Sequence, residues 1–232
     1  MAIGLSLLAG CNAPKEVAGD DRSLDFTADW AFRLGDDTAA ARPDYNDADW
    51  RKLNLPHDWA IEGEFSKDNP SGTGGGALPG GIGWYRKTFT ADKADEGKRY
   101  RIDFDGAYMN STVYINGHEL GTRPYGYISF SYDLTPYIKW GEENVLAVRV
   151  DNAEQPNSRW YSGSGIFRNV WLETTNKLHI DQWGTYITTP KVTNEMASVH
   201  LESTIKNQYS SPKKAVLFTI IFKNGTKITL SS

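Results

Sequence analysis

Residues 157–171 carry the side chains of this sequence that are best suited to binding a sugar, and they read Asn-Ser-Arg-Trp-Tyr-Ser-Gly-Ser-Gly-Ile-Phe-Arg-Asn-Val-Trp. Arg159 offers a rigid fork of donors for hydroxyl groups, and the neighbouring Trp160 and Tyr161 offer apolar ring faces. The two glycines that follow allow tight bends and close approach of a ligand. The segment therefore predicts a sugar-binding loop. The alternative is a β-hairpin with both aromatic rings in the core and Arg159 in an ion pair.

Four further motifs lie upstream of this segment. They are Leu-Pro-His-Asp-Trp at 55–59, Gly-Gly-Ile-Gly-Trp-Tyr-Arg-Lys-Thr-Phe at 80–89, Val-Tyr-Ile-Asn-Gly at 113–117 and Gly-Tyr-Ile-Ser-Phe at 126–130. Together with Ser-Arg-Trp-Tyr-Ser-Gly-Ser-Gly-Ile-Phe-Arg-Asn-Val, they resemble, in the same order, the N-terminal part of family 2 glycoside hydrolases of the β-galactosidase type. Several linked motifs in order are far more specific than any one of them, and the resemblance spans roughly residues 24–230.

The resemblance implies an all-β chain of two units. Residues 22–175 would form a galactose-binding-like jelly-roll sandwich, and residues 176–232 would begin an immunoglobulin-like β-sandwich. A complete sandwich of that second kind needs about 100 residues and seven strands, so we expect a truncated one here. In the family the catalytic glutamate pair lies on a (β/α)₈ barrel that follows, and this sequence ends before a barrel.

The resemblance also implies a role in substrate recognition. Arg159 matches the family's Ser-Arg-Trp-Tyr arginine and would donate hydrogen bonds to hydroxyls of a terminal galactose, while Trp160 would offer its ring to the apolar face of the sugar. His57 and Asp58 complete the expected substrate-binding set, either by direct contact, by orienting their loop or by pairing with each other. Tyr161 is assigned to the core. The expected partners are a β-galactoside or related glycan and the catalytic barrel of the same polypeptide, and no cofactor is implied.

Three other functions remain open at this point. The chain could belong to a β-glucuronidase or β-mannosidase relative, because these enzymes share the fold. It could be a free-standing carbohydrate-binding module, since fold alone does not decide function. A structural or adhesive sandwich domain fits the Arg-Trp-Tyr loop least well.

No residue of this sequence is assigned to catalysis. Retaining glycosidases use two carboxyl groups about 5–5.5 Å apart. Asp58, Glu62 and Glu64 follow the Leu-Pro-His motif and are the best candidates here, but they do not resemble the family's catalytic motifs. Their charges are better interpreted as solvated loop charges.

Composition narrows the possible classes of function. The net charge is −4 and the sequence has no basic block, which argues against a nucleic-acid partner. A single cysteine excludes an internal disulfide. The four histidines, at positions 57, 118, 179 and 200, do not have the spacing of a metal site. The sequence therefore contains no His/Cys metal site and implies no cofactor, while a cation held by carboxylates and carbonyls stays open.

The first eleven residues are apolar and end in Leu-Ala-Gly-Cys, which resembles the end of a bacterial lipoprotein signal peptide. The resemblance implies cleavage before Cys11 and lipidation of its thiol, with residues 1–21 acting as signal and polar tether. The basic region that normally opens such a signal is missing. We expect an exported protein, anchored by lipid in the periplasm or on the outer cell surface. A homo-oligomer is left open, because oligomers are common in the family.

Local patterns predict short strands throughout. Apolar residues alternate with charged ones at 99–105, and Asn116-Gly117 follows a β-branched run, which is a strong hairpin signal. Residues 69–83 hold many glycines and predict a long loop at the rim of a site. A single helical turn is expected at 136–140.

Beyond a boundary near 175–178, strands are expected at 198–205, 214–222 and 226–230, the last two joined by Asn224-Gly225. Half a sandwich would leave one face of these strands without a partner sheet, so this unit should be poorly ordered or prone to aggregate by itself.

Overall fold

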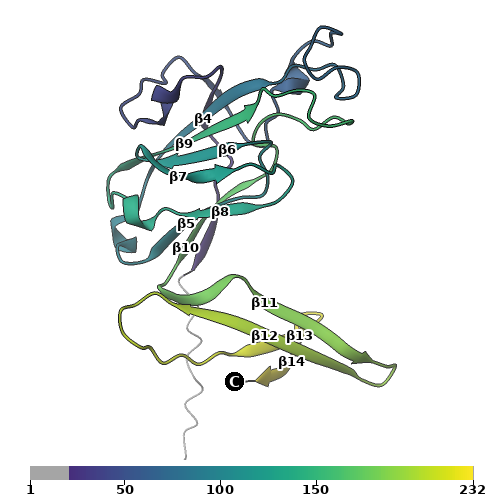
Figure 1. Ribbon diagram of the computed structural model, residues 1–232. Helices are drawn as coiled ribbons and strands as arrows, with labels where there is room; N and C mark the ends of the chain where they lie inside the picture. Colours follow the sequence, from purple (N-terminus) through teal and green to yellow (C-terminus); the bar gives the residue numbers. More distant parts are fainter. Residues whose placement is uncertain (1–20, 232) are drawn as a thin grey trace, which may run out of the picture.

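The computed structural model describes residues 21–231, and this part of the chain is all-β (Figure 1). A sandwich of two antiparallel sheets comes first, and a smaller unit of β-hairpins follows it. The all-β fold that the sequence predicts is thereby confirmed. Cys11 and nearly all of the expected signal and tether at 1–21 lie outside the described residues.

The sandwich has a six-stranded and a four-stranded layer. The larger sheet has the strand order β3 (Arg51–Leu53), β2 (Trp30–Leu34), β4 (Gly81–Thr90), β9 (Glu143–Asn152), β6 (Ser111–Ile115) and β7 (His118–Arg123). The smaller sheet has the order β1 (Arg22–Asp25), β10 (Val170–Thr175), β5 (Arg99–Phe104) and β8 (Phe130–Asp133). Strands distant in sequence are therefore neighbours, and loops from many parts of the chain meet at the two ends of the sandwich.

One apolar core fills the space between the layers. In β5 the alternating residues Ile102 and Phe104 are fully buried, as the sequence pattern predicts. From the larger sheet, Tyr85 on β4 and Val148 on β9 pack into the same core, and their strands pair over ten residues. Burial of each such side chain contributes roughly 1.5–3 kcal/mol to stability, so the core fixes the strand ends from which the loops start.

Turns follow the local chemistry of the sequence. Asn116 (φ 50°) and Gly117 (φ 84°) connect β6 to β7, which confirms the predicted hairpin.

The helical turn expected at 136–140 is instead a 3₁₀ turn, η4 (Thr135–Tyr137), and it ends earlier than predicted. The reason is that the buried Asn144 side chain bonds both the N–H and the C=O of Lys139, 2.9 and 3.0 Å away, and so takes these groups out of any helix.

The second unit consists of two hairpins. The first pairs β11 (Leu178–Val192) with β12 (Ala197–Asn207), and the second pairs β13 (Thr219–Lys223) with β14 (Thr226–Ser231). The strand predicted at 214–222 is wrong in its first half, because β13 begins at Thr219. Val216 and Phe218 are exposed, so no partner sheet holds these residues in an extended ladder.

Polar contacts join the two units. The Ser131 hydroxyl on β8 donates to the Gln182 side chain on β11 over 2.7 Å. Gln182 precedes a bulge at which Trp183 has a positive φ of 52° and an indole that is 77% exposed. The first part of β11 therefore rests on the sandwich, whereas much of the apolar surface farther along the hairpin remains uncovered.

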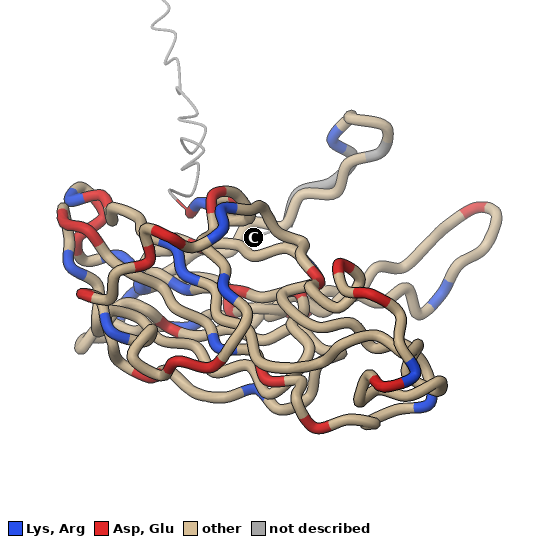
Figure 2. The backbone as a smooth tube through the Cα atoms, turned by 90° about the horizontal axis from the view of Figure 1, so that it is seen from above, with Lys and Arg blue, Asp and Glu red and all other residues tan. Residues whose placement is uncertain are grey.

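Charges of both signs are interspersed over the described backbone (Figure 2). Within residues 21–231, no helix is both long enough and apolar enough to cross a bilayer.

We expect amide hydrogen exchange to be much faster at 183–231 than in β4, β5 and β9. The physical reason is that few buried apolar contacts support the hairpin backbone, so local opening there costs little free energy. Exchange followed by mass spectrometry on the monomer measures this difference, with light scattering to detect association through the exposed faces. Slow exchange of both units in a single cooperative transition would contradict the expectation.

Candidate functional site

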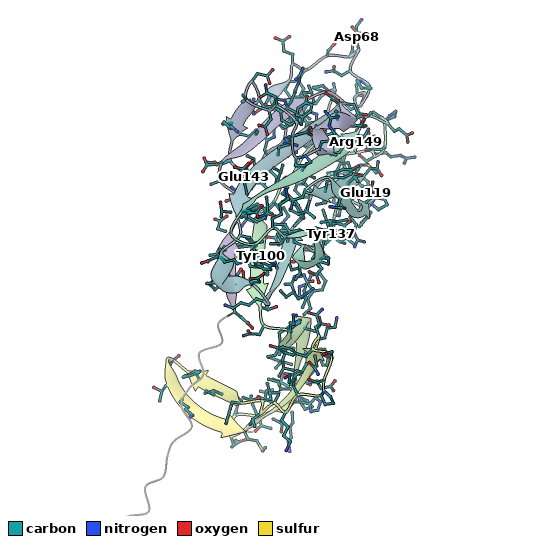
Figure 3. The ribbon with its side chains drawn as sticks, turned by 90° about the vertical axis from the view of Figure 1, so that its left-hand side faces the viewer. Asp68, Tyr100, Glu119, Tyr137, Glu143 and Arg149 are labelled. Carbon is teal, nitrogen blue, oxygen red and sulfur yellow. The ribbon has the colours of Figure 1, made fainter. Side chains whose placement is uncertain are left out.

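The predicted recognition segment lies in the connection between β9 and β10. Figure 1 shows it beside the glycine-rich loop that precedes β4, and Figure 3 places Asp68 of that loop at the end of the sandwich far from β11–β14. The two loops touch: a Cβ added at Gly74 would lie 3.8 Å from the Cα of Arg159. The glycine-rich loop therefore lies next to the predicted recognition segment, and its role as the rim of a site stays a prediction.

The glycine-rich loop is held by its own hydrogen bonds. The Asn69 amide donates to the carbonyls of Glu64 and Ala77, both at 2.8 Å, and the Ser71 hydroxyl donates to the carbonyl of Leu78 at 2.7 Å. No strand or helix lies between residues 63 and 80, and β4 begins at Gly81, two residues before the predicted loop end. The loop thus forms a defined wall beside Arg159.

Asp58 ties the recognition segment to the sandwich. Its carboxylate accepts the Ser164 N–H at 2.8 Å, the Ala60 N–H at 2.9 Å and the hydroxyl of Tyr161. Burial, together with the hydrogen bond to Asp58, raises the pKa of the Tyr161 phenol, so this hydroxyl is a donor at neutral pH. One side chain therefore fixes two points of the segment and its own loop.

Gly165 explains why the segment can lie so close to the core. A Cβ at this position would lie 2.4 Å from the Tyr85 hydroxyl and 2.6 Å from the His57 carbonyl oxygen, and φ is 131°. Only glycine combines that backbone conformation with so close an approach. The predicted close approach at this glycine serves the protein's own backbone.

His57 is 8% exposed and its ring is enclosed by protein partners. Its Nε2 lies 2.9 Å from Nη2 of Arg51, and its Nδ1 lies 2.7 Å from the Tyr85 hydroxyl. Because arginine can only donate, Nε2 accepts, and Nδ1 carries the proton and donates to Tyr85. Burial lowers the pKa of His57, so the imidazole is neutral at pH 7.

The carboxylate of Glu62 completes this network through a two-point contact with Arg51, at 2.7 and 2.9 Å. The hydrogen bonds from Arg51 lower the pKa of Glu62. His57 and Asp58 therefore have separate partners and do not pair with each other. Direct sugar contact by either of them stays a prediction, and the structure gives both an architectural task.

Arg159 and the two aromatic residues after it face solvent. Arg159 is exposed, and among the described residues none forms a hydrogen bond or ion pair with its guanidinium. Trp160 is 60% exposed and Tyr161 is 42% exposed. The alternative of a core hairpin is therefore wrong, as is the assignment of Tyr161 to the core: the Asp58 contact draws the phenol to the surface loop. What remains is a free cation beside an accessible ring.

Sequence reasoning missed three tyrosines next to Trp160. Tyr108, Tyr125 and Tyr127 line a cavity together with Trp160, whose indole N–H donates to the Tyr127 hydroxyl at 2.8 Å. The usable signal was the run Pro-Tyr-Gly-Tyr at 124–127, in which two aromatic residues flank a glycine. Its position beside residue 160 depends on the fold and could not be read from spacing.

No metal centre is formed by the described part of the chain: it contains no group of three or more His, Cys, Asp and Glu side chains placed to hold an ion. The chemistry that the site offers is hydrogen-bond donation from Arg159 and contact with aromatic faces.

We expect Asp58→Ala to lower the free energy of unfolding by about 1–3 kcal/mol, because the Ser164 N–H and the Tyr161 hydroxyl lose their acceptor. Urea denaturation measures the loss, and hydrogen exchange at 157–165 should accelerate. Asp68→Ala is the matched control, since Asp68 is an exposed loop residue (Figure 3). Equal stability of the two variants would rule out an anchoring role for Asp58.

The protein should lose stability as the pH falls below about 6.5, the ordinary pKa of histidine. His57 has a lowered pKa in the folded state, so the unfolded chain binds its proton first and is favoured as acid is added. His57→Gln should flatten the profile of unfolding midpoints between about pH 6.5 and 5.5, above the range where carboxylates titrate. Profiles with the same slope would show that another group is responsible.

Comparison with known proteins gives the site its context. Residues 77–176 match the family described as glycosyl hydrolases family 2, sugar binding domain. Over 201 residues the chain is 66% identical to "Beta-galactosidase BoGH2A" of Bacteroides ovatus, which covers 87% of this chain and 24% of that protein. It is 42% identical over 230 residues to a putative beta-glucuronidase of Formosa agariphila, covering 99% of this chain and 22% of that protein.

Solved structures agree with these matches. A beta-glycosidase from Bacteroides vulgatus superposes with a TM-score of 0.83 at 42% identity, covering 90% of this chain and 27% of that one. A beta-glucuronidase from glycoside hydrolase family 2 superposes with a TM-score of 0.82 at 30% identity, covering 92% and 25%. The chain thus spans about a quarter of the length of these relatives. It belongs to the family 2 glycosyl hydrolases and carries their sugar-binding domain.

Proposed function

We propose that this chain is the sugar-recognition end of a longer glycosidase of the β-galactosidase type, which removes terminal β-galactosides. The observation that carries the proposal is the exposed guanidinium of Arg159, which has no partner among the described residues and lies beside Trp160 on an anchored loop. Because this guanidinium is exposed and unpaired, its hydrogen-bond donors are available to a ligand. Hydroxyls of a hexose can accept from this arginine while the ring covers the apolar face of the sugar.

The proposed roles are divided among the four predicted residues. Arg159 and Trp160 contact the sugar directly. His57 and Asp58 act through the loop, since His57 is buried and the Asp58 carboxylate is engaged by Tyr161 and two backbone N–H groups. The proton transfers of hydrolysis need a pair of carboxyl groups, and this chain's contribution is to bind and orient the substrate next to them.

A galactoside is proposed as substrate because the relative at 66% identity is named a beta-galactosidase. A glucuronide is the second candidate, and one observation favours it: a free arginine can form a two-point contact with the carboxylate of a uronic acid. The relative at 42% identity is named a putative beta-glucuronidase. Paired rates on nitrophenyl galactoside and nitrophenyl glucuronide separate the two candidates.

A free-standing carbohydrate-binding module is the third candidate, favoured by the exposed rings of Tyr125, Tyr127 and Trp160. Reading the gene beyond codon 232 tests this candidate against the first. A frame that continues into a barrel with two catalytic glutamates supports the glycosidase, whereas a stop codon there supports a binding module.

We also propose that the protein is exported and lipid-anchored through Cys11, on the strength of the Leu-Ala-Gly-Cys sequence. Intact mass of the protein from its native host tests this, and a mass that retains unmodified Met1 overturns it.

In the enzyme that carries this chain, Arg159→Ala should lower kcat/KM for a β-galactoside about ten- to a hundredfold, because a substrate hydroxyl loses its hydrogen-bond donor. Steady-state kinetics measures this loss. Arg168→Ala is the matched control, since Arg168 is an exposed arginine nine residues further along the same connection. Wild-type kinetics in the Arg159 variant would remove this residue from the proposed site.

The 232-residue chain alone should not hydrolyse nitrophenyl galactoside. Turnover by the purified chain that survives repeated chromatography would contradict the proposed division between recognition and catalysis.

A further inference from the structure

An aromatic cavity of about 380 Å³ adjoins the proposed recognition loop. The Tyr108 ring, 4% exposed, forms its floor, and the exposed rings of Tyr125, Tyr127 and Trp160 form its walls. The Tyr127 centroid lies 5.1 Å from that of Tyr108 and 5.5 Å from that of Tyr125, with both ring pairs in edge-to-face geometry. The floor and walls together therefore come from three separate segments of the chain that the sandwich brings together.

Hydrogen bonds hold these walls in place without a ligand. The Trp160 indole donates to the Tyr127 hydroxyl at 2.8 Å, and the Tyr108 hydroxyl lies 3.3 Å from the Asn157 amide oxygen. The Asn157 amide in turn donates to the buried Asn152 at 2.7 Å. A site whose walls are already fixed loses little conformational entropy when it binds.

Gly126 also shapes the aromatic cavity. A Cβ at this position would lie 2.3 Å from the ring of Tyr108, so only glycine lets the loop between the two exposed tyrosines rest on the floor of the cavity. The close approach turns Tyr125 and Tyr127 into neighbouring walls. Such an arrangement of otherwise costly exposed rings points to a ligand with an apolar face.

The lining selects the chemistry of that ligand. The cavity is lined by aromatic, amide and hydroxyl groups, with no acidic or basic residue among them, so the ligand should be neutral. Its volume falls within the range of about 300–1,000 Å³ typical of small-ligand sites. A pyranose ring fits this description, because it combines a C–H face for stacking with a rim of hydroxyls.

A neighbouring cavity of about 370 Å³ is less suited to this role. It shares Met109 and Asn157 with the aromatic cavity, but its other walls are mostly polar, contain no aromatic ring, and include the carboxylates of Asp151 and Glu154. That carboxylate is already engaged, by Arg149 at 3.1 Å and by the Ala153 N–H at 3.0 Å. The polar cavity therefore adjoins the aromatic cavity, but the ring faces on which a sugar can stack lie in the aromatic cavity.

We propose that the aromatic cavity is a second glycan subsite, which binds a neutral pyranose unit next to the unit held at Arg159. The placement beside Arg159 rests on the proposed function; the neutral, stacking chemistry rests on the cavity itself. Because Trp160 is adjacent to Arg159 in sequence and belongs to the cavity wall, one glycan can contact both. The subsite favours substrates of two or more sugar units over a single galactose with a small leaving group.

All walls of the cavity belong to this chain, so binding is measurable on the chain itself. We would titrate the ¹⁵N-labelled protein with lactose and follow the indole N–H resonance of Trp160, assigned with Trp160→Phe. This proton bonds the Tyr127 hydroxyl, so it reports directly on the cavity. We expect a saturable shift with a Kd of about 1–10 mM, and about a fivefold or larger weakening in Tyr125→Ala.

Tyr137→Ala is the matched control, because Tyr137 is also an exposed tyrosine but stacks on His118, nearer the second unit (Figure 3). It should leave the Kd unchanged. The other tryptophan indole resonances should keep their positions in Tyr125→Ala, which shows that the variant is folded.

The remaining outcomes separate this inference from the proposed function. If Arg159→Ala weakens binding and Tyr125→Ala does not, the second subsite is overturned and the role of Arg159 stands. If both variants weaken binding, both are supported. No shift of Trp160 at about 100 mM lactose, far above the expected Kd, overturns the subsite, and kinetics of Arg159→Ala still tests the proposed function. A shift with tetramethylammonium but not with lactose also overturns it, because the rings would then form a cage for a cation.

Discussion

The carboxylate of Asp58 is the central link between the proposed recognition loop and the rest of the sandwich. It accepts hydrogen bonds from Ser164, from Ala60 and from the Tyr161 hydroxyl, and so joins the loop before β4 to the connection between β9 and β10. Charge-assisted hydrogen bonds are stronger and more directional than neutral ones. Further hydrogen bonds hold the same connection, among them those from Asn152 to the Gly163 carbonyl and the Ser164 hydroxyl and from Trp160 to Tyr127, and Asp58 acts together with them.

The network behind the anchor is polar but fully partnered. Arg51 bonds both Glu62 and His57, and the neutral imidazole of His57 bonds Tyr85 in the core. Buried polar groups are tolerated when each has a partner, and such networks specify one arrangement rather than several. Gly165 complements the network by letting the loop backbone approach Tyr85 and His57 more closely than any other residue would allow. These contacts hold the side of the loop that faces the core, and Arg159 and Trp160 on the other side stay exposed.

The solvent-facing side of the loop, in contrast, carries side chains that are exposed. Arg159 has no protein partner among the described residues, and the rings of Trp160, Tyr125 and Tyr127 are open to solvent. The exposed aromatic rings support the recognition role proposed for this surface, whereas the exposed apolar side chains of β11 and β12 belong to a hairpin that has no covering sheet among the described residues. The distinction lies in preorganisation. Trp160 donates to the Tyr127 hydroxyl and Tyr127 packs edge to face on Tyr108 and Tyr125, whereas the exposed Trp183 and Tyr186 of the hairpin have no such partner among the described residues.

Local sequence patterns predicted many of the strands and turns of this protein. Alternation predicted the strands, and Asn116-Gly117 predicted a hairpin because both residues accept positive φ. The Arg-Trp-Tyr run with its glycines predicted a loop, which lies exposed at the surface, and its sugar-binding role stays a prediction. Tertiary structure alone decided which side chains are accessible: it buried His57, exposed Tyr161 and assembled one cavity from residues near 108, 126 and 158. These outcomes depend on strand order, and strand order is set by burial over the whole core, which no local window of sequence contains.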